Sequence, residues 1–239
     1  MSGNVQVVPG LVVPSGDEAR APVKPDAEHH RPGAPSNVFW HGGGPASEMR
    51  PLQFGHPPVS FWLTGLSGAG KSTIAFELEQ RLRADGRPCT VLDGDNLRYG
   101  LNCDLGFSED DRRENIRRTG EVARLMNDAG LIVIASLISP YRKDRATAQR
   151  IIGEDRFIEV HVSTPLEVCV ARDPKGLYKK ARQGEIRHFT GVTSPYEPPL
   201  APSVVVDTSQ LAHGGAAAEL HAYLIERERC EGKRHAAAK

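Results

Sequence analysis

The segment Gly65–Ser72, which reads GLSGAGKS, constrains the fold more than any other part of the chain. It follows an apolar run, Val59–Leu63, that is typical of a β-strand. It precedes Ile74, Leu78 and Leu82, which recur at the spacing of one helix face. Glycines let consecutive backbone N–H groups turn toward phosphate oxygens, and the N-terminus of the next helix adds positive charge. The pattern therefore predicts a strand, a phosphate-binding loop and a helix, in that order.

The loop contains two side chains with a predictable role in nucleotide binding. Lys71 would reach the β- and γ-phosphates of a nucleoside triphosphate, and the hydroxyl of Ser72 would bind Mg²⁺. We therefore expect a nucleoside triphosphate and Mg²⁺ as cofactors. The predicted nucleotide-binding residues are Gly65, Leu66, Ser67, Gly68, Ala69, Gly70, Lys71, Ser72 and Thr73.

Apolar runs alternate with helical patterns along the rest of the chain. Four further runs are predicted strands: Cys89–Leu92, Leu131–Leu137, Phe157–Val162 and Ser203–Val206. The second of these is rich in β-branched residues, as in a strand buried on both faces of a parallel sheet. Helices are expected from Ser108, which forms a capping box with Asp111, and at Arg142–Ile152, Pro165–Arg172 and about Gly215–Arg229. Strands separated by helices predict a three-layer α/β domain with five parallel strands.

Both ends of the chain differ from this pattern. Residues 1–35 are rich in Pro, Gly, Ala and charged residues, so we expect a disordered N-terminal extension. The acidic residues in this extension argue against an organellar transit peptide, and no secretory signal is visible. Residues 231–239 are expected to form a flexible tail, which leaves 36–230 as the folded domain.

Composition narrows the classes of partner. Lys plus Arg and Asp plus Glu both number 30, so the basic excess typical of nucleic-acid-binding proteins is absent. No run approaches the roughly 18 apolar residues of a membrane span. The four cysteines, Cys89, Cys103, Cys169 and Cys230, form no CxxC pair, and we expect reduced thiols. A cytoplasmic protein that binds neither nucleic acid nor membrane is predicted.

The sequence Asp93-Gly-Asp95 follows the second predicted strand, at the sheet edge where open parallel sheets bind ligands. Two carboxylates there could hold a metal through water, orient an acceptor hydroxyl or take its proton. Asp95 is the better candidate for the acceptor, although an Asp-Gly turn with a helix cap is also compatible. Since the run Leu131–Leu137 does not end in Asp, the metal site is expected to rest on Ser72, phosphates, water and either Asp93 or Asp95. Of the two carboxylates, Asp93 is the predicted metal ligand.

Five arginines crowd beside this acidic turn: Arg98, Arg112, Arg113, Arg117 and Arg118. The planar guanidinium suits phosphate or sulfate oxygens, which favours an anionic acceptor. Alternatively, most of them form a solvated helix face paired with Glu109, Asp110 and Glu114. Spacing alone does not decide which arginines point inward.

Taken together, these segments resemble the adenylylsulfate kinase family. The resemblance extends from about Asn37 to Leu224, and its blocks are residues 65–73, 93–102, 104–108, 113–118, 138–142, 173–182, 184–191, 195–197 and 207–208. A phosphate-binding loop alone is common to many kinases, whereas these blocks in this order are specific. The resemblance implies a P-loop NTPase-type fold with strand order 2-3-1-4-5 and a lid over both substrates. It also implies that ATP phosphorylates the 3′-hydroxyl of adenylyl sulfate, giving 3′-phosphoadenylyl sulfate.

The resemblance further implies roles for individual residues. Phe107 and Phe189 would enclose the adenine of adenylyl sulfate, because aromatic faces stack well on bases. The lid, residues 172–191, would bring cationic side chains onto phosphate. The implied catalytic residues are Lys71, Asp95 and Ser139, and Arg172 joins the ATP-binding set. The implied substrate-binding residues are Asp93, Arg98, Phe107, Arg112, Asn115, Ile138, Ser139, Lys175, Gly176, Leu177 and Phe189.

Three questions stay open at this point. Ser139 matches a candidate phosphoserine of related bacterial enzymes, although direct in-line transfer is favoured because both substrates can share one cleft. Another acceptor, such as a nucleoside monophosphate or a shikimate-like hydroxyl compound, and a nucleotide-binding module without catalysis are the rival functions. A homodimer and association with a separate ATP sulfurylase are expected from the family.

Overall fold

The computed structural model describes the backbone of residues 54–237 and the side chains of residues 54–230. The predicted extension, residues 1–35, and the start of the family resemblance, residues 37–53, lie outside this part of the chain. Five parallel strands form one sheet: β1 (Ser60–Thr64), β2 (Cys89–Asp93), β3 (Ile132–Ser136), β4 (Phe157–Val162) and β5 (Val204–Val206). Their order, β2-β3-β1-β4-β5, confirms the expected topology.

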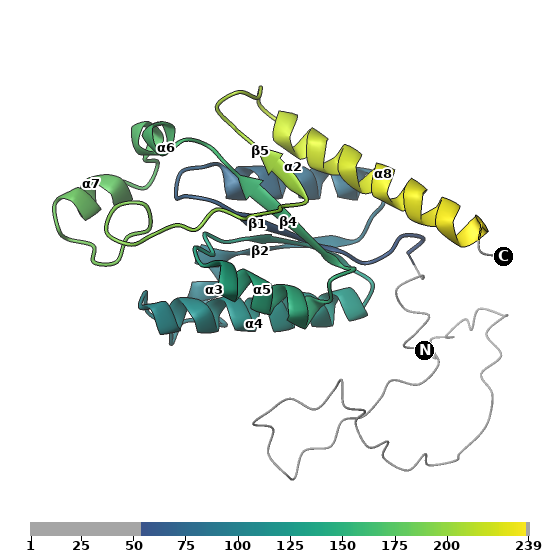
Figure 1. The fold of residues 1–239 in the computed structure, drawn as a ribbon, viewed down its shortest axis with the longest axis horizontal. Helices are drawn as coiled ribbons and strands as arrows, with labels where there is room; N and C mark the ends of the chain where they lie inside the picture. Colours follow the sequence, from purple (N-terminus) through teal and green to yellow (C-terminus); the bar gives the residue numbers. More distant parts are fainter. Residues whose placement is uncertain (1–53, 238–239) are drawn as a thin grey trace, which may run out of the picture. The chain divides into compact units, whose positions relative to one another are not determined.

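Helices cover both faces of the sheet (Figure 1). The helices of the described residues are α2 (Lys71–Ala84), α3 (Gly94–Tyr99), α4 (Glu109–Asp128), α5 (Arg142–Ile152), α6 (Leu166–Arg172), α7 (Leu177–Arg182) and α8 (Gly215–Ala237). Helices α2 and α8 pack together on one face, and α4 packs with α5 on the other. The short helices α3 and α7 are absent from the sequence predictions, and α8 continues past the predicted end near Arg229.

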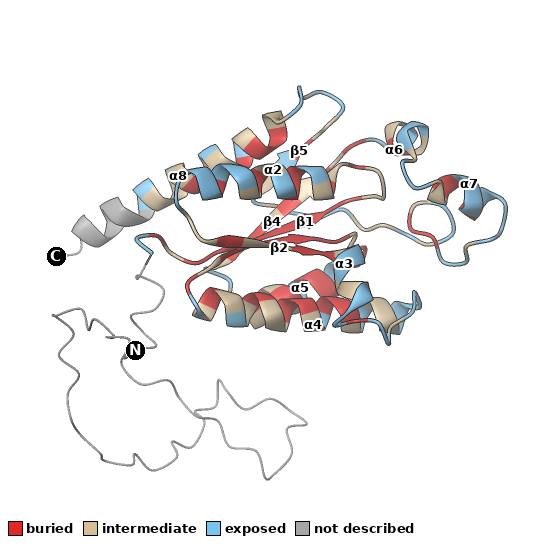
Figure 2. Cartoon of the chain, turned by 180° about the vertical axis from the view of Figure 1, so that it is seen from behind, coloured by how far each residue is buried: buried red, intermediate tan, exposed pale blue. Residues whose placement is uncertain are grey.

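The sheet separates two hydrophobic cores, which explains why the three central residues of β1 are all apolar. Phe61 and Leu63 belong to the core under α2 and α8, whereas Trp62 belongs to the core with α4 and α5. All three are fully buried, and Figure 2 shows the strands as a buried layer between helices with exposed outer faces. Successive side chains of a strand point to opposite faces, so a central strand must be apolar on both.

Local capping determines where the helices beside the ligand edge begin. Ser108 caps α4 in the predicted capping box, with its hydroxyl accepting from the backbone N–H of Asp111. Asp93 caps α3, because its carboxylate accepts from the backbone N–H groups of Asp95 and Asn96. All four cysteines are free. The caps place the starts of α3 and α4 next to the carboxyl ends of the strands.

Candidate active site

The loop between β1 and α2 depends on glycine at three positions. Gly65, Gly68 and Gly70 have φ angles of 155°, 76° and 98°, which L side chains rarely adopt. A Cβ on Gly65 would lie 2.5 Å from the carbonyl oxygen of Val162 on β4. The loop therefore keeps its shape only with glycine at this position, as the motif predicted.

Lys71, the first residue of α2, is buried in this loop. Its Nζ donates to the carbonyl oxygen of Leu66 at 2.7 Å, so the side chain folds back along the loop. Burial, helped by the nearby positive charge of Lys175, lowers the pKa of Lys71 to about 8. A lysine ammonium that is poorly solvated here is ready to bind a polyanion, because phosphate oxygens would replace its lost hydration.

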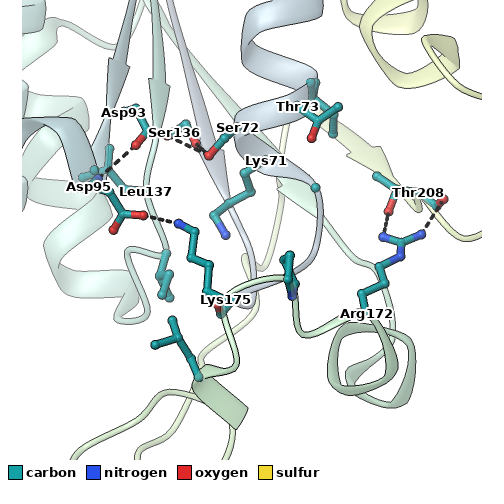
Figure 3. Close-up of a pocket in the computed structure, with 18 of the residues that line it drawn as sticks. Lys71, Ser72, Thr73, Asp93, Asp95, Ser136, Leu137, Arg172, Lys175 and Thr208 are labelled. Atoms are coloured by element: carbon teal, nitrogen blue, oxygen red, sulfur yellow. Dashed lines mark hydrogen bonds and ion pairs between the residues drawn. The ribbon is translucent and has the colours of Figure 1, made fainter. Parts of the chain in front are cut away.

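Oxygen ligands gather beside the start of α2. The hydroxyl of Ser72 donates to Asp93 Oδ2 at 2.7 Å and lies 3.3 Å from the hydroxyl of Ser136 (Figure 3). Hydroxyl and carboxylate oxygens suit Mg²⁺, which binds few protein ligands and keeps phosphate and water in its remaining positions. The residues present therefore fit the ion. Ser136 was missed at the sequence level, although its pairing with Asp93 in the sheet follows from the strand order.

Asp95 and Lys175 form an ion pair across the site (Figure 3). Asp95 lies in the first turn of α3, and Lys175 lies in the loop between α6 and α7. Both side chains are more than half exposed, so the pair is weak and can exchange partners on ligand binding. Lys71 and Lys175 extend into the same space, which supports a shared role toward phosphate.

Arg172, at the end of α6, is held by a threonine. Its guanidinium donates to the hydroxyl of Thr208 at 2.7 Å and to the carbonyl of Thr208 at 3.1 Å. The same hydroxyl donates to the carbonyl of Ala69 at 3.0 Å and lies 2.8 Å from the hydroxyl of Thr164. Thr208 thus links Arg172 to the phosphate loop. The sequence showed Thr208 as part of a family block but gave it no role.

The crowded arginines divide into two groups. Three of them pair with carboxylates: Arg113 with Asp110, Arg117 with Glu114, and Arg118 with Glu114 and Asp104. Among the described residues, Arg98 and Arg112 form no carboxylate ion pair. Their guanidinium groups donate to backbone carbonyls and lie 4.4 Å and 5.6 Å from the ring centre of Phe107. These are the two arginines that the family resemblance selected.

The two predicted adenine-binding phenylalanines differ sharply in environment. Phe107 is 58% exposed, whereas Phe189 is 6% exposed and belongs to the hydrophobic core. The ring of Phe189 meets that of Tyr178 edge-on at 5.0 Å, and the Tyr178 hydroxyl donates to the carbonyl of Ser67 at 3.0 Å. Burial raises the pKa of Tyr178, which keeps the hydroxyl a donor. The lid helix α7 therefore joins Phe189 to the phosphate loop.

Ser139 lies in a strained turn after β3. It has a φ of 37° and is 3% exposed, and its hydroxyl accepts from the indole N–H of Trp62 at 3.2 Å. Its carbonyl accepts from the buried guanidinium of Arg145 at 2.7 Å. The carbonyl of Ile138 accepts from the hydroxyl of Thr64 at 2.8 Å. Several buried donors thus hold this turn in place.

One cavity of about 1130 Å³ brings these groups together. Lys71, Ser72, Asp93 and Asp95 line it, and so do Arg112 and both phenylalanines. A recess of about 80 Å³ adjoins it and is lined by Arg98, Asn115 and Ser139, among others. Leu177 lines the large cavity, whereas Gly176 starts α7 with a φ of 66° and is absent from both linings. Gly65, Leu66 and Ala69 of the predicted nucleotide-binding set are also absent from both linings, and the other predicted residues line one or both of these adjoining spaces.

Comparison with known proteins identifies the family. The family model described as adenylylsulphate kinase matches residues 57–207. The chain belongs to the adenylylsulfate kinase family. An adenylyl-sulfate kinase of Shewanella amazonensis is 53% identical over 190 residues, which cover 80% of this chain and 96% of that protein. The family assignment made from the sequence blocks is therefore confirmed.

Solved adenylylsulfate kinases share the fold. The Mycobacterium tuberculosis APS kinase, solved in complex with AMPPNP and APS, is 46% identical, with a TM-score of 0.69. The match covers 71% of this chain and 98% of that chain. A hexameric APS kinase from Thiobacillus denitrificans is 32% identical with a TM-score of 0.56, and the match covers 77% of this chain and 32% of that one. Within residues 54–237, no helix is both long and apolar enough to span a membrane.

Proposed function

We propose that this adenylylsulfate kinase transfers the γ-phosphate of ATP to the 3′-hydroxyl of adenylyl sulfate, giving 3′-phosphoadenylyl sulfate and ADP. The observation that carries the proposal is the single cavity that joins the phosphate loop to the Phe107 and Arg112 end. A triphosphate at one end and an aromatic, arginine-rich acceptor site at the other allow direct transfer without release of an intermediate. The ligands of the Mycobacterium tuberculosis relative, AMPPNP and APS, are of these two kinds.

On the donor side, the backbone N–H groups of the loop and Lys71 would bind the phosphates. Ser72 and Asp93 would hold Mg²⁺, with Ser136 beside them. The ion would offset negative charge on the phosphates as the γ-phosphoryl group transfers. Arg172, fixed by Thr208, would contact the nucleotide at the far end of the same cavity.

On the acceptor side, Asp95 would accept a hydrogen bond from the 3′-hydroxyl and take its proton. The oxygen of that hydroxyl forms a bond to the γ-phosphorus while the bond from that phosphorus to the β,γ-bridging oxygen breaks, and ADP leaves. For this, Lys175 must release Asp95, and the γ-phosphate is the natural new partner for its ammonium. ATP binding and activation of the acceptor hydroxyl are therefore linked, because the γ-phosphate draws Lys175 away from Asp95 and frees the carboxylate that the hydroxyl needs.

Ser139 fits a role in holding the turn better than a role as a phosphate carrier. Its hydroxyl is nearly inaccessible and already bonded to Trp62, so phosphorylation would require the turn to open. The packing supports the one-step route. A Ser139→Ala variant should therefore keep most of the wild-type turnover. Mass spectrometry of the wild-type protein during turnover should detect no phosphoserine at Ser139.

The proposal is tested by incubating the purified protein with ATP, Mg²⁺ and adenylyl sulfate and resolving the nucleotides by chromatography. Equal amounts of 3′-phosphoadenylyl sulfate and ADP are expected. Turnover of a nucleoside monophosphate or shikimate, but not of adenylyl sulfate, would overturn the acceptor assignment. ATP binding without turnover of any acceptor would instead favour a module without catalysis.

The family also leads us to propose a cytoplasmic homodimer that associates with a separate ATP sulfurylase. Light scattering after size exclusion would distinguish a dimer from a monomer or from the hexameric state of the Thiobacillus denitrificans relative. Retention of the protein on immobilised ATP sulfurylase would test the association. The dimer and the association are independent of the reaction, so either can fail without affecting it.

A further inference from the structure

Two buried asparagines meet behind the acceptor recess. Asn102, in the segment between α3 and α4, has no exposed surface, and its Nδ2 donates to Asn115 Oδ1 at 2.9 Å. Asn115, on α4, is 6% exposed and lines the recess together with Arg98 and Arg112. Asn102 is absent from the lining of either cavity, so its side chain reaches the recess through the hydrogen bond to Asn115.

The backbone fixes both asparagines. The N–H of Asn102 donates to the carbonyl of Leu97 at 2.9 Å, and the carbonyl of Asn102 accepts from the N–H of Leu105 at 3.1 Å. Asn115 lies within the second turn of a capped helix, and its carbonyl accepts from the hydroxyl of Thr119 at 2.7 Å. The hydrogen bond between the two side chains therefore joins two rigid segments and leaves little freedom in how either amide lies.

This hydrogen bond decides which end of the Asn115 amide is available. Its oxygen is engaged by Asn102, whereas its Nδ2 makes no hydrogen bond within the described residues. That nitrogen is not completely buried, and Asn115 lines the recess, so the N–H₂ group retains access to it. Turning both amides over would leave both N–H groups of Asn102 unpaired at a position without exposed surface. The observed orientation leaves its Oδ1 and one of its two N–H groups without a partner among the described residues, and a buried carbonyl oxygen without a partner is less rare than a buried N–H group without one.

The recess consequently presents donors. Arg98 and Arg112 have no acceptor atoms on their side chains, and Asn115 adds an N–H group. Burial lowers the pKa of each arginine from its ordinary value, which shows that both guanidinium groups are partly desolvated. Partly desolvated donors favour an anionic oxygen over a neutral hydroxyl, because a charged acceptor replaces more of the lost hydration.

We propose that Asn102 is a positioning residue for the acceptor. It holds the carbonyl oxygen of Asn115 away from the recess, so that the N–H₂ group of Asn115 binds an anionic oxygen of the phosphosulfate. The inference rests on the proposed function, since it assigns part of the adenylyl sulfate to this recess. It predicts that Asn102 affects acceptor binding only through Asn115.

A double-mutant cycle on the purified full-length protein tests this route. Asn102→Ala and Asn115→Ala should each raise the KM for adenylyl sulfate about tenfold, while the KM for ATP stays within about twofold. The double variant should be no worse than Asn115→Ala alone, because Asn102 has no other path to the ligand. Additive effects in the double variant would overturn the proposal.

The matched control is Asn127→Ala. Asn127 is also on α4 and fully buried, and its amide bonds to Ser60, Val59 and Leu131 away from the cavity. It should lower the melting temperature without changing the KM for adenylyl sulfate. An equal rise in that KM for Asn127→Ala would reduce the Asn102 effect to general destabilisation.

Asn115→Asp tests the polarity and does not depend on a stable Asn102 variant. Asn102 can still donate to one carboxylate oxygen, which leaves the other facing the anionic acceptor. The KM for adenylyl sulfate should then exceed that of Asn115→Ala, whereas an equal or lower KM would show that the recess does not receive an anionic oxygen. If the wild-type protein makes no 3′-phosphoadenylyl sulfate at all, the proposed function fails rather than the role of Asn102.

Discussion

The donor and acceptor ends of the cavity are built in opposite ways. At the donor end, backbone groups of the loop at Gly65–Gly70 and the buried side chain of Lys71 form the site, and glycine conformation determines its shape. At the acceptor end, long side chains such as Arg98, Arg112 and Phe107 form it; the two arginines are partly buried and Phe107 is 58% exposed. The first end is complete before a ligand binds, whereas the second is completed around the ligand.

The two ends should differ in how much conformational entropy is lost when a ligand binds. A preformed loop orders little on binding, so most of its interaction energy appears as affinity. Exposed side chains lose rotamer freedom when they close on a ligand, at a cost of about 0.5–1.5 kcal/mol each. The ion pair between Asp95 and Lys175 adds a contact that must break first. Changes to the loop backbone of the donor end should therefore affect folding and both substrates, and changes at the acceptor end should affect one substrate.

The largest effect is expected for Lys71→Ala. Removing the ammonium removes charge stabilisation of the transferring phosphoryl group, and kcat should fall at least about a thousandfold. The fold should persist, because within residues 54–230 the Lys71 side chain hydrogen-bonds only to the carbonyl of Leu66. Chromatographic measurement of product and thermal unfolding of the same sample check both statements. Turnover at the wild-type rate would contradict the role of Lys71.

Gly65→Ala should disrupt the donor end through its backbone. The new Cβ would clash with the carbonyl of Val162, and the backbone shift that this clash forces should lower the free energy of unfolding by about 1–3 kcal/mol. ATP affinity, measured by calorimetry, should fall with it. Gly86→Ala is the control: φ is 71° but nothing lies within 4 Å, so about 1 kcal/mol of strain is expected with unchanged ATP affinity. Equal ATP affinities in the two variants would show that the backbone at Gly65 does not determine ATP binding at the donor end.

Variants of the two phenylalanines should distinguish a role in packing from a role in acceptor binding. Phe189→Ala should lower the free energy of unfolding by about 3 kcal/mol, because it empties a core position against Tyr178. Phe107→Ala should change stability by less than about 0.5 kcal/mol and still raise the KM for adenylyl sulfate. Denaturant unfolding and steady-state kinetics measure the two quantities. Similar losses of stability in the two variants would show that Phe107 and Phe189 contribute equally to the packing of the folded protein.

The smallest effect is a pH dependence of Lys71. Its pKa is about 8 in the folded protein and 10.5 in the unfolded chain, so the unfolded chain binds more protons between these values. Between pH 8 and 10.5 this residue should therefore make the protein more stable as pH rises. Over the same range ATP affinity should decrease, because the ammonium that binds phosphate is lost.

The difference between the wild-type protein and Lys71→Met isolates this contribution. Denaturant unfolding and calorimetry with a non-hydrolysable ATP analogue, each from pH 7 to about 10, give the two trends. The variant should lack both. Parallel pH curves for the two proteins would show that Lys71 does not titrate in this range.

The sequence predicted the sheet and the phosphate loop because both follow from local rules. Apolar runs, a capping box at Ser108 and a glycine motif each determine their own backbone without help from distant residues. The short helices α3 and α7 were missed, because six residues give too little periodicity to recognise a helix. Asp93 was read as a possible cap, and it is one, while it also accepts from Ser72.

The acceptor end could not be derived from local patterns. Spacing did not separate Arg98 and Arg112 from their neighbours, since the distinction lies in which carboxylates the other three meet in space. Thr208 and Ser136 gave no signal for the same reason: each contacts residues more than 30 positions away. The family resemblance provided what the pattern lacked, although the binding roles of these residues stay predictions.

The buried indole of Trp62 offers an optical consequence. Its N–H donates to the hydroxyl of Ser139, its ring centre lies 5.7 Å from that of Phe157, and the residue has no exposed surface. Its fluorescence should be blue-shifted and should respond when an acceptor occupies the neighbouring recess. With Trp40 replaced by phenylalanine, the protein would report acceptor binding through its own emission, without a label and without turnover.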